Sequence, residues 1–323
     1  MLENQAISDS KSTSRKWDLA SYGRNILPYF VLGVVIVFFQ IVSKGSMINV
    51  RNLTAIFNEM FVIILGSSAM IFLMAQGKID MSIAGIVAVS GAIGAYAAKL
   101  HPAMLLPVTL LTGLLIGCIN GLIVNKLRID SFVATLAVSF ILTGLVQWIL
   151  IDGVLAIPYE LMPLDNTNLK AAVIVVIVVI GYILFQYGNF GKQSRAIGSR
   201  TEVARQSGVN INKITIISYM LTGATAGLVA FFNLCRSGSA SMATGSHLQF
   251  NVMQALLLGG MALSGGSGSR FSSAILGSLT MAILSNGMTL WGIESLSQQL
   301  IRGVLFVITV SLTFNRDNIE IIK

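Results

Sequence analysis

The amino-acid sequence predicts an all-α, polytopic membrane protein of about ten transmembrane helices. Of its 323 residues, 54% are hydrophobic and 11% are charged, whereas soluble domains carry about 25% charged residues. At least five apolar stretches of seventeen or more residues contain no Asp, Glu, Lys or Arg. Each is long enough to cross about 30 Å of hydrocarbon as a helix. Because backbone polar groups in lipid need partners within their own segment, helices are expected throughout.

Ten apolar segments are the predicted spans. The first follows a polar stretch, residues 1–25, and no Ala-x-Ala cleavage pattern comes after it, so we expect a retained helix rather than a secretory signal. The eighth and tenth segments are short for a full crossing. In chain order the predicted spans are 26–42, 55–75, 82–98, 104–124, 132–151, 171–187, 214–234, 250–263, 272–291 and 300–314.

The basic residues predict the orientation of these spans. With the N-terminus in the cytoplasm, fifteen of the 21 Lys and Arg residues lie on the cytoplasmic side, five lie outside, and Arg302 lies in the last span. This bias obeys the positive-inside rule. We therefore expect a cytoplasmic N-terminal segment (1–25), a transmembrane domain (26–314) with a long cytoplasmic loop (188–213), and a cytoplasmic tail (315–323).

Several classes of function lack support in the sequence. The net charge of +8 is spread over the loops, which argues against a nucleic-acid surface. Cys118, Cys235, His101 and His247 have no neighbours at metal-ligand or catalytic spacing, so we expect neither a metal nor an enzyme. The glycine-rich run SGGSGSR (264–270) lacks a phosphate-loop pattern and is interpreted as a tight turn. The chain should therefore bind no cofactor and hydrolyse no ATP itself.

Few polar residues interrupt the predicted spans. Glu59 and Arg302 lie near helix ends, where their charged groups can reach the aqueous interface. Asp80 lies in the polar break QGKIDMS (76–82), where it could either cap the third helix or face a solute pathway. Weakly polar residues could line a pathway or make hydrogen bonds between helices. The pathway candidates are Gln76, Asp80, Ser82, Asn120, Ser139, Ser285 and Asn286.

The loop 188–213 is the longest basic segment and contains the pattern of a short helix. In SRTEVARQSG (199–208), Ser199 or Thr201 can cap the helix, Val203 and Ala204 form an apolar side, and Gly208 can end it. Such a helix would suit docking to a partner subunit. The alternative is a solvated loop whose charges only fix the topology.

Five segments together resemble a known family. Their order and number make the resemblance, which covers residues 26–314, more specific than any single motif. The chain resembles the ribose-type (monosaccharide) permeases of bacterial ATP-binding-cassette (ABC) importers. The segments are QGKIDMSIAGIVAVSGAI (76–93), DSFVATLAVSFILTGL (130–145), RAIGSRTEVARQSGVNINK (195–213), LLLGGMALSGGSGS (256–269) and NGMTLWGIESLSQQLIRGVL (286–305).

The resemblance implies a permease bundle in the bacterial inner membrane that imports a pentose, hexose, polyol or autoinducer-2-like solute. It implies four kinds of partner: a second permease copy or paralogue, two ATP-binding domains that use ATP and Mg, an extracytoplasmic solute-binding protein, and the lipid bilayer. The coupling segment of the family falls on residues 195–210. Its candidate coupling residues here are Arg195, Ala196, Ile197, Gly198, Glu202, Ala204, Arg205, Ser207 and Gly208.

Some residues depart from the pattern of the family. Lys78, Met81 and Ala84 replace the usual Gly, Leu and Gly around Asp80, and Arg200 stands where Asn is common. Lys78 could alter polarity near a pathway or lie in a cytoplasmic loop. The alternative to an ABC permease is a sugar carrier driven by an ion gradient, which would usually show several acids inside the membrane. Asp80 and Glu59 are the acids available here for that role.

Overall fold

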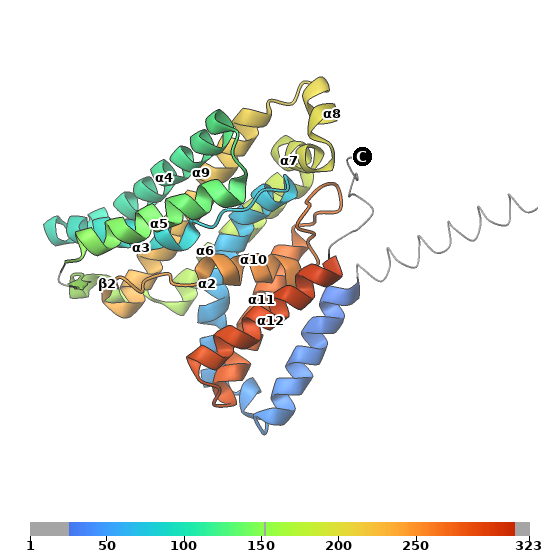
Figure 1. Cartoon of the computed structure of the whole chain (residues 1–323). Coiled ribbons are helices and arrows are strands. Elements are labelled where there is room, and N and C mark those ends of the chain that lie inside the picture. Colours follow the sequence, from blue (N-terminus) through green and yellow to red (C-terminus); the bar gives the residue numbers. More distant parts are fainter. Residues whose placement is uncertain (1–25, 152, 314–323) are drawn as a thin grey trace, which may run out of the picture.

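The computed structural model describes residues 26–151 and 153–313 and places a helix in each of the ten predicted spans (Figure 1). Seven of these helices are long and apolar enough to cross a membrane, and three shorter ones are also apolar. The predicted segments 1–25 and 315–323, and Phe314, lie outside the described residues. The prediction of an all-α polytopic bundle is confirmed.

Helices make up most of the chain. They are an apolar helix Ile26–Val42, α2 (Val50–Ala75), α3 (Ile83–Leu100), α4 (Leu105–Leu127), α5 (Ser131–Ile149), α6 (Thr167–Tyr182), α7 (Asn189–Ser199), α8 (Thr201–Gln206), α9 (Ile211–Ser237), α10 (Leu248–Leu258), α11 (Ser272–Leu290) and α12 (Ser295–Thr313). Short 3-10 turns η1 (Ser46–Ile48), η2 (Pro102–Met104) and η3 (Tyr159–Leu164) and a π-helical turn η4 (Ile183–Tyr187) join them.

The bundle has two distinct ends. At one end, β1 (Val154–Ala156) pairs antiparallel with β2 (Ser239–Ser241), with Leu155 opposite Ala240. At the other end lie α7 and α8, which Figure 1 shows at the top, away from β2. We call these the β1–β2 end and the α7–α8 end. The predicted cytoplasmic loop 188–213 contains both α7 and α8.

At the centre of the bundle lies α9, which packs against both α2 and α3. Close packing of α4 on α9 depends on small residues: a Cβ added at Gly113 or Gly117 would overlap backbone atoms of Gly223 or Tyr219. This agrees with the use of small residues at helix contacts in lipid, where no hydrophobic force drives helices together.

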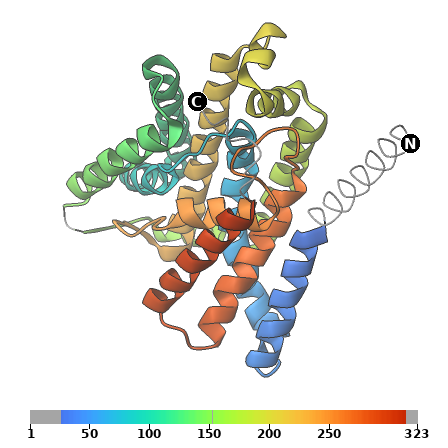
Figure 2. The same ribbon diagram turned by 45° about the vertical axis from the view of Figure 1, so that its right-hand side comes forward.

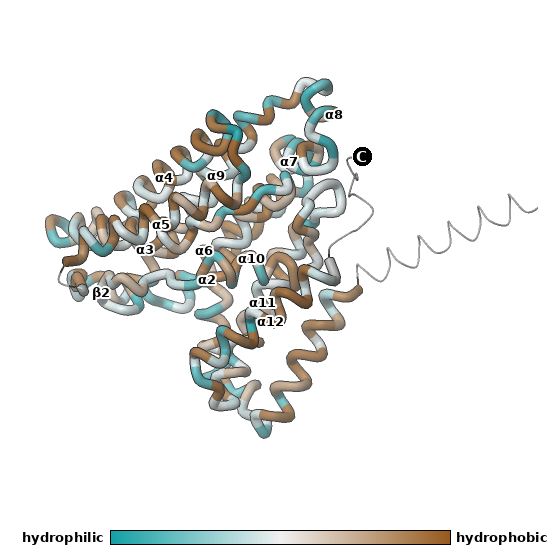
Figure 3. Tube along the Cα trace, viewed as in Figure 1, coloured by the Kyte–Doolittle hydropathy of each residue, from teal (hydrophilic) through white to brown (hydrophobic). Residues whose placement is uncertain are grey.

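The outer helices are rich in apolar residues, which are brown in Figure 3, and many of their side chains are exposed. On α5 the exposed residues include Phe140, Ile141 and Trp148. The helix Ile26–Val42 runs along the outside of the bundle (Figure 2). Its Phe39 belongs to the same buried apolar cluster as Leu284 and Met288 of α11. Such surfaces are suited to lipid rather than water.

The eighth and tenth predicted spans differ in the structure. The tenth is a continuous helix, α12, of 19 residues. The eighth is broken, because α10 has 11 residues and ends at Leu258 rather than at the predicted residue 263. At 1.5 Å per residue, α10 is about 16 Å long and cannot cross the membrane alone. Non-helical chain at residues 242–247 and 259–271 flanks it. Irregular backbone at membrane depth is tolerated where it is buried or lines a polar cavity.

Candidate functional site

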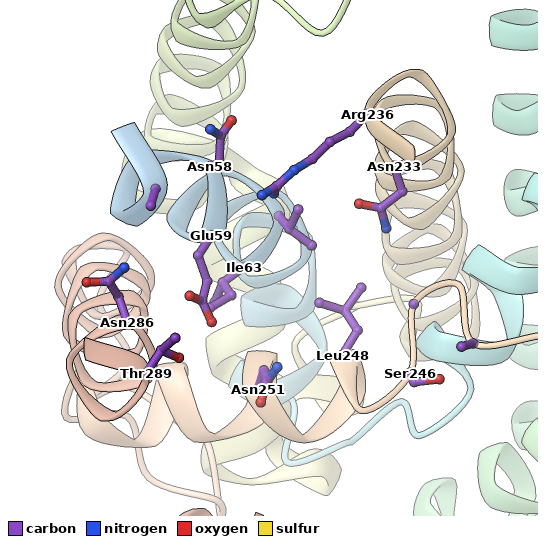
Figure 4. A pocket seen from close by; sticks show the side chains of 14 residues that line it. Asn58, Glu59, Ile63, Asn233, Arg236, Ser246, Leu248, Asn251, Asn286 and Thr289 are labelled. Atoms are coloured by element: carbon purple, nitrogen blue, oxygen red, sulfur yellow. The ribbon is translucent and has the colours of Figure 1, made fainter. Parts of the chain in front are cut away.

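A polar cavity lies between α2, α9, α10 and α11, in the half of the bundle near the β1–β2 end (Figure 4). Its volume is about 460 Å³. Each of these helices contributes to the lining, and the non-helical residues before α10 form part of the rim. The lining residues are Ala55, Asn58, Glu59, Val62, Ile63, Asn233, Arg236, Ala243, Gly245, Ser246, Leu248, Asn251, Asn286 and Thr289.

The cavity carries charge of both signs. Glu59 of α2 is half-buried, and Arg236 lies in the last turn of α9. Figure 4 shows the Arg236 side chain extending from α9 across the cavity toward Glu59. The positive charges of Arg302 and Arg236 both act on the Glu59 carboxylate. The cavity therefore offers carboxylate acceptors on one side and guanidinium donors on the other.

Amide side chains complete the polar lining. Asn58, Asn233, Asn251 and Asn286 come from α2, α9, α10 and α11. The Oδ1 atom of Asn286 is buried and has no hydrogen-bond partner among the described residues. A buried acceptor without a partner costs free energy of about 1–3 kcal/mol. Asn286 therefore adds an amide side chain to the cavity wall, with its Oδ1 atom turned into the protein.

Arg302 of α12 supports the cavity wall from behind. Its Nη1 donates to Asn251 Oδ1 at 3.3 Å, and its Nη2 donates to Ser285 Oγ at 2.6 Å. With its oxygen held by Arg302, the amide of Asn251 turns its nitrogen toward the cavity, as Figure 4 shows. The sequence reading placed Arg302 near a helix end, free to reach the interface. The structure instead places its guanidinium among α10, α11 and α12, where planar bidentate donors suit several acceptors.

Lys170 is a second residue whose position the sequence did not predict. The charge rule counted Lys170 in an outside loop, but it lies in the first turn of α6 and is 3% exposed. Its Nζ donates to Asn58 Oδ1 at 2.7 Å, pairs with the Asp165 carboxylate, and lies 5.6 Å from the centre of the Phe61 ring. Lys170 therefore fixes Asn58 and joins the chain before α6 to the cavity-lining helix α2.

The predicted pathway residues fall into separate places. Asn286 lines the cavity, and Ser285 lies directly behind it, bonded to Arg302. Ser139 of α5 is half-buried beside α3, and its carbonyl accepts a hydrogen bond from Thr143. The remaining candidates, Gln76, Asp80, Ser82 and Asn120, gather in and around the break between α2 and α3, on the side of the α7–α8 end.

The break between α2 and α3 is a buried polar cluster. Asp80 is fully buried, and its Oδ1 accepts from the Ser82 amide at 2.8 Å and the Ser82 hydroxyl at 2.6 Å. Asn120 of α4 donates to the Ser82 hydroxyl at 2.7 Å. Burial raises the pKa of Asp80 to about 6, while the hydrogen bonds from Ser82 oppose this shift. Asp80 thus stabilises the turn that leads into α3, but it is not the cap of that helix, whose N-cap residue is Ser82 and has no side-chain cap bond.

Gln76 and Lys78 join this break to α9. Gln76 donates to Ser218 Oγ at 2.7 Å and accepts from Thr215 Oγ1 at 2.8 Å. Lys78 Nζ donates to the same Thr215 hydroxyl at 3.3 Å, and burial lowers the pKa of Lys78. The side-chain amide of Gln76 therefore makes two hydrogen bonds to α9 and a third, to Phe72 O, within α2. Lys78 does not contact the cavity lining but lies against the first turn of α9.

The candidate coupling residues form a compact unit, which we call the α7–α8 unit (189–208). Two of them point inward: Ile197 is 2% exposed and Ala204 is 4% exposed, and both pack with Ile214 of α9. Arg195 is half-buried, with its guanidinium over the Phe185 ring and a bond to Gln186 O. The exposed members are Ala196, Glu202, Arg205, Ser207 and Gly208.

The structure changes details of the predicted short helix. Gly208 ends α8 as expected, since its φ of +81° is a conformation that favours glycine. The predicted caps are wrong. The N-cap residue is Arg200, without a side-chain bond, because the Ser199 hydroxyl binds Arg195 O and accepts from Ser267 N, and Thr201 binds Ile197 O. The predicted apolar side is divided, because Ala204 is buried and Val203 is 52% exposed.

Comparisons with known proteins agree with this architecture. The family described as "Branched-chain amino acid transport system / permease component" matches residues 52–310. No solved structure matches the chain. The ribose import permease protein RbsC of Escherichia coli (strain K12) is 27% identical over 294 residues, covering 85% of this chain and 90% of the relative.

Two further relatives carry names of other sugars. The L-arabinose ABC transporter permease protein AraH of Azospirillum brasilense is 27% identical over 324 residues, covering 97% of this chain and 93% of the relative. The D-allose transport system permease protein AlsC of Escherichia coli (strain K12) is 23% identical over 319 residues, covering 95% and 96%. The chain belongs to the branched-chain amino acid transport system permease family and, within it, to the ribose-type permeases that form the membrane-spanning subunits of ABC importers.

Proposed function

We propose that this permease imports a sugar or sugar-like small polar solute, of the pentose, hexose, polyol or autoinducer-2 class, through the polar cavity. The observation that carries the proposal is the cavity itself: about 460 Å³ of space, lined by four amides, a carboxylate and a guanidinium, inside a bundle whose outer faces are apolar. Polar side chains inside membrane bundles are costly and mark solute pathways.

The lining suits a solute with many hydroxyl groups. A hydroxyl both donates and accepts, so it can donate to Glu59 and accept from Asn251 or Arg236. Neutral solutes also avoid the need to desolvate a net charge in the bundle. The sugars in the names of the relatives, ribose, arabinose and allose, are therefore the first solutes to test.

The α7–α8 unit is the proposed docking site of the ATP-binding subunits. It lies at the end of the bundle opposite the cavity, and its exposed residues include Glu202, Val203 and Arg205. In the proposed assembly two ATP-binding domains use ATP and Mg at this end, in the cytoplasm. A second permease copy or paralogue lies beside the chain, and a solute-binding protein delivers the solute from outside.

The same arrangement gives the proposed orientation. Spans alternate in direction along the chain. If the α7–α8 end is cytoplasmic, the start of the helix Ile26–Val42 and the end of α12 therefore lie on the cytoplasmic side as well. Both termini are then cytoplasmic in the inner membrane. The β1–β2 end faces outward, and the exposed rim residues Arg236 and Ser246 meet the solute first.

Reconstituted uptake tests this proposal. Proteoliposomes that contain the permease with its ATP-binding subunit and solute-binding protein should accumulate one of the three sugars when ATP and Mg are present on the α7–α8 side. Uptake should stop without ATP and should continue when a proton uncoupler is added. Uptake by the permease alone, driven by a proton or sodium gradient, would replace the proposal with an ion-coupled carrier.

A further inference from the structure

The glycine-rich run 264–270, interpreted from the sequence as a tight turn, joins α10 to α11 at the α7–α8 end. Both flanking helices line the cavity, through Asn251 on α10 and Asn286 on α11. The turn therefore connects two walls of the cavity to the opposite end of the bundle. The segments that contact the turn at that end can therefore transmit a movement to α10 and α11.

Three segments of backbone meet beside this turn. The Gly266 amide donates to Ala75 O, the carbonyl of the last residue of α2, at 2.9 Å. The Ser267 amide donates to the Ser199 hydroxyl, at the end of α7, at 2.9 Å. Gly198 packs directly on Ala75 O and would bring an added Cβ to 2.7 Å from Gly266 N. We call this contact of α2, α7 and the turn the α2–α7–turn junction (Ala75, Gly198, Ser199, Gly266, Ser267).

The junction has little freedom to slip. Gly198 and Gly266 have no side chains, so the three backbones touch directly, and a displacement of α7 must push α2 and the turn or break their hydrogen bonds. Closely packed contacts transmit displacements rather than absorbing them. The α2 helix runs from the junction at Ala75 to the cavity at Glu59, and the turn leads into α10 and α11. The fourth cavity wall, α9, follows α8 after a connection of four residues, 207–210.

We propose that the α2–α7–turn junction passes the movement of the α7–α8 unit to the cavity walls, and that Gly198 and Ser199 are its positioning residues. This inference rests on the proposed function, because it assumes that an ATP-binding subunit moves the α7–α8 unit. The docking surface and the junction lie on different sides of that unit: Glu202 and Arg205 are exposed, whereas Gly198 faces Ala75. A variant can therefore disturb transmission without disturbing docking.

The test compares two glycine variants. In Gly198→Ala the new Cβ overlaps the Ala75 carbonyl oxygen and separates α7 from α2. Gly268→Ala is the matched control, since its Cβ meets nothing within 4 Å in the same turn. In proteoliposomes we expect the sugar transported per ATP to fall about tenfold in Gly198→Ala, the size of a typical coupling between two sites. Gly268→Ala should transport normally.

A second pair of variants applies if Gly198→Ala does not insert. Ser199→Ala removes the acceptor of the Ser267 amide, whereas Ser199→Thr keeps a hydroxyl. Loss of coupling in the first and recovery in the second would support the junction. Normal coupling in both Gly198→Ala and Ser199→Ala would overturn the proposal. So would a loss of subunit binding that accompanies the loss of coupling. If the wild-type assembly shows no ATP-dependent uptake, the proposed function fails instead, which separates the two results.

Discussion

Val203→Asp is expected to abolish uptake by removing the ATP-binding subunit from the permease. Val203 is 52% exposed on α8, between Glu202 and Ala204, and an apolar side chain in this position is suited to a partner surface. A carboxylate there would have to be desolvated on docking, at a cost of about 3 kcal/mol, or about a hundredfold in affinity. The measurement is co-purification of the two subunits from detergent, followed by uptake.

Val203→Leu is the matched control and should bind and transport normally, because it keeps an apolar side chain of similar shape. Ala204→Asp, at the neighbouring position, should behave differently from Val203→Asp. Ala204 is packed against Ile197 and Ile214, so a carboxylate there would disrupt the α7–α8 unit itself. Normal binding of the ATP-binding subunit by Val203→Asp would exclude α8 as the docking surface.

Lys170→Met should destabilise the permease by about 3 kcal/mol or more, because removing one partner from a buried ion pair leaves the other charge uncompensated. Asp165 would lose its cation, and Asn58 Oδ1 would lose its donor. The measurement is the apparent Tm of the purified protein in detergent, with tryptophan fluorescence as the signal that reports unfolding. Asn58 would also lose its fixed position, so the KM for the sugar should rise in whatever protein remains folded.

The double variant Lys170→Met with Asp165→Leu distinguishes an ion pair from simple packing. Replacing both charges with apolar residues of similar volume often restores stability. We therefore expect the double variant to be more stable than Lys170→Met alone. A double variant that is as unstable as the sum of its single variants would show that the two side chains do not act as a pair.

The fold was largely predictable because its signal is repeated along the chain. Long apolar runs interrupted by basic loops predict helices wherever they occur, and each of the ten predicted spans contains a helix, although α10 is too short to cross the membrane alone. The prediction of the eighth span was wrong at its C-terminal end. Residues 259–263 are apolar enough to extend a helix, but the helix ends at Leu258. Hydropathy records the environment of these residues and not their backbone conformation.

The site was less predictable, since it depends on which helix faces meet. Asn286 and Ser285 are conspicuous as polar residues in an apolar helix, and the structure places Asn286 in the cavity lining and Ser285 behind it. Glu59 and Arg302 lie near helix ends, and only the packing of α12 against α10 and α11 turns Arg302 inward. Lys170 looked like a topology signal, and its partners Asp165 and Asn58 come from different segments.

The α7–α8 unit shows the same limit at shorter range. Its basic composition and the stop at Gly208 were visible in the sequence, and both hold. The sequence did not show which side of α8 faces inward, because a helix of 6 residues has too few turns to show a periodic pattern. The caps failed for a related reason: Ser199 is engaged by a turn more than sixty residues away.

Protection of a single cysteine tests most directly whether solute passes through the cavity. The background replaces Cys118 and Cys235 with alanine. Asn233→Cys then places a thiol in the cavity lining, and Ser237→Cys places one a turn later on α9, outside the lining. In vesicles that transport the sugar, we predict that the sugar slows modification of Asn233→Cys by an impermeant thiol reagent and leaves Ser237→Cys unchanged. Equal modification of Asn233→Cys with and without transported sugar would contradict the account.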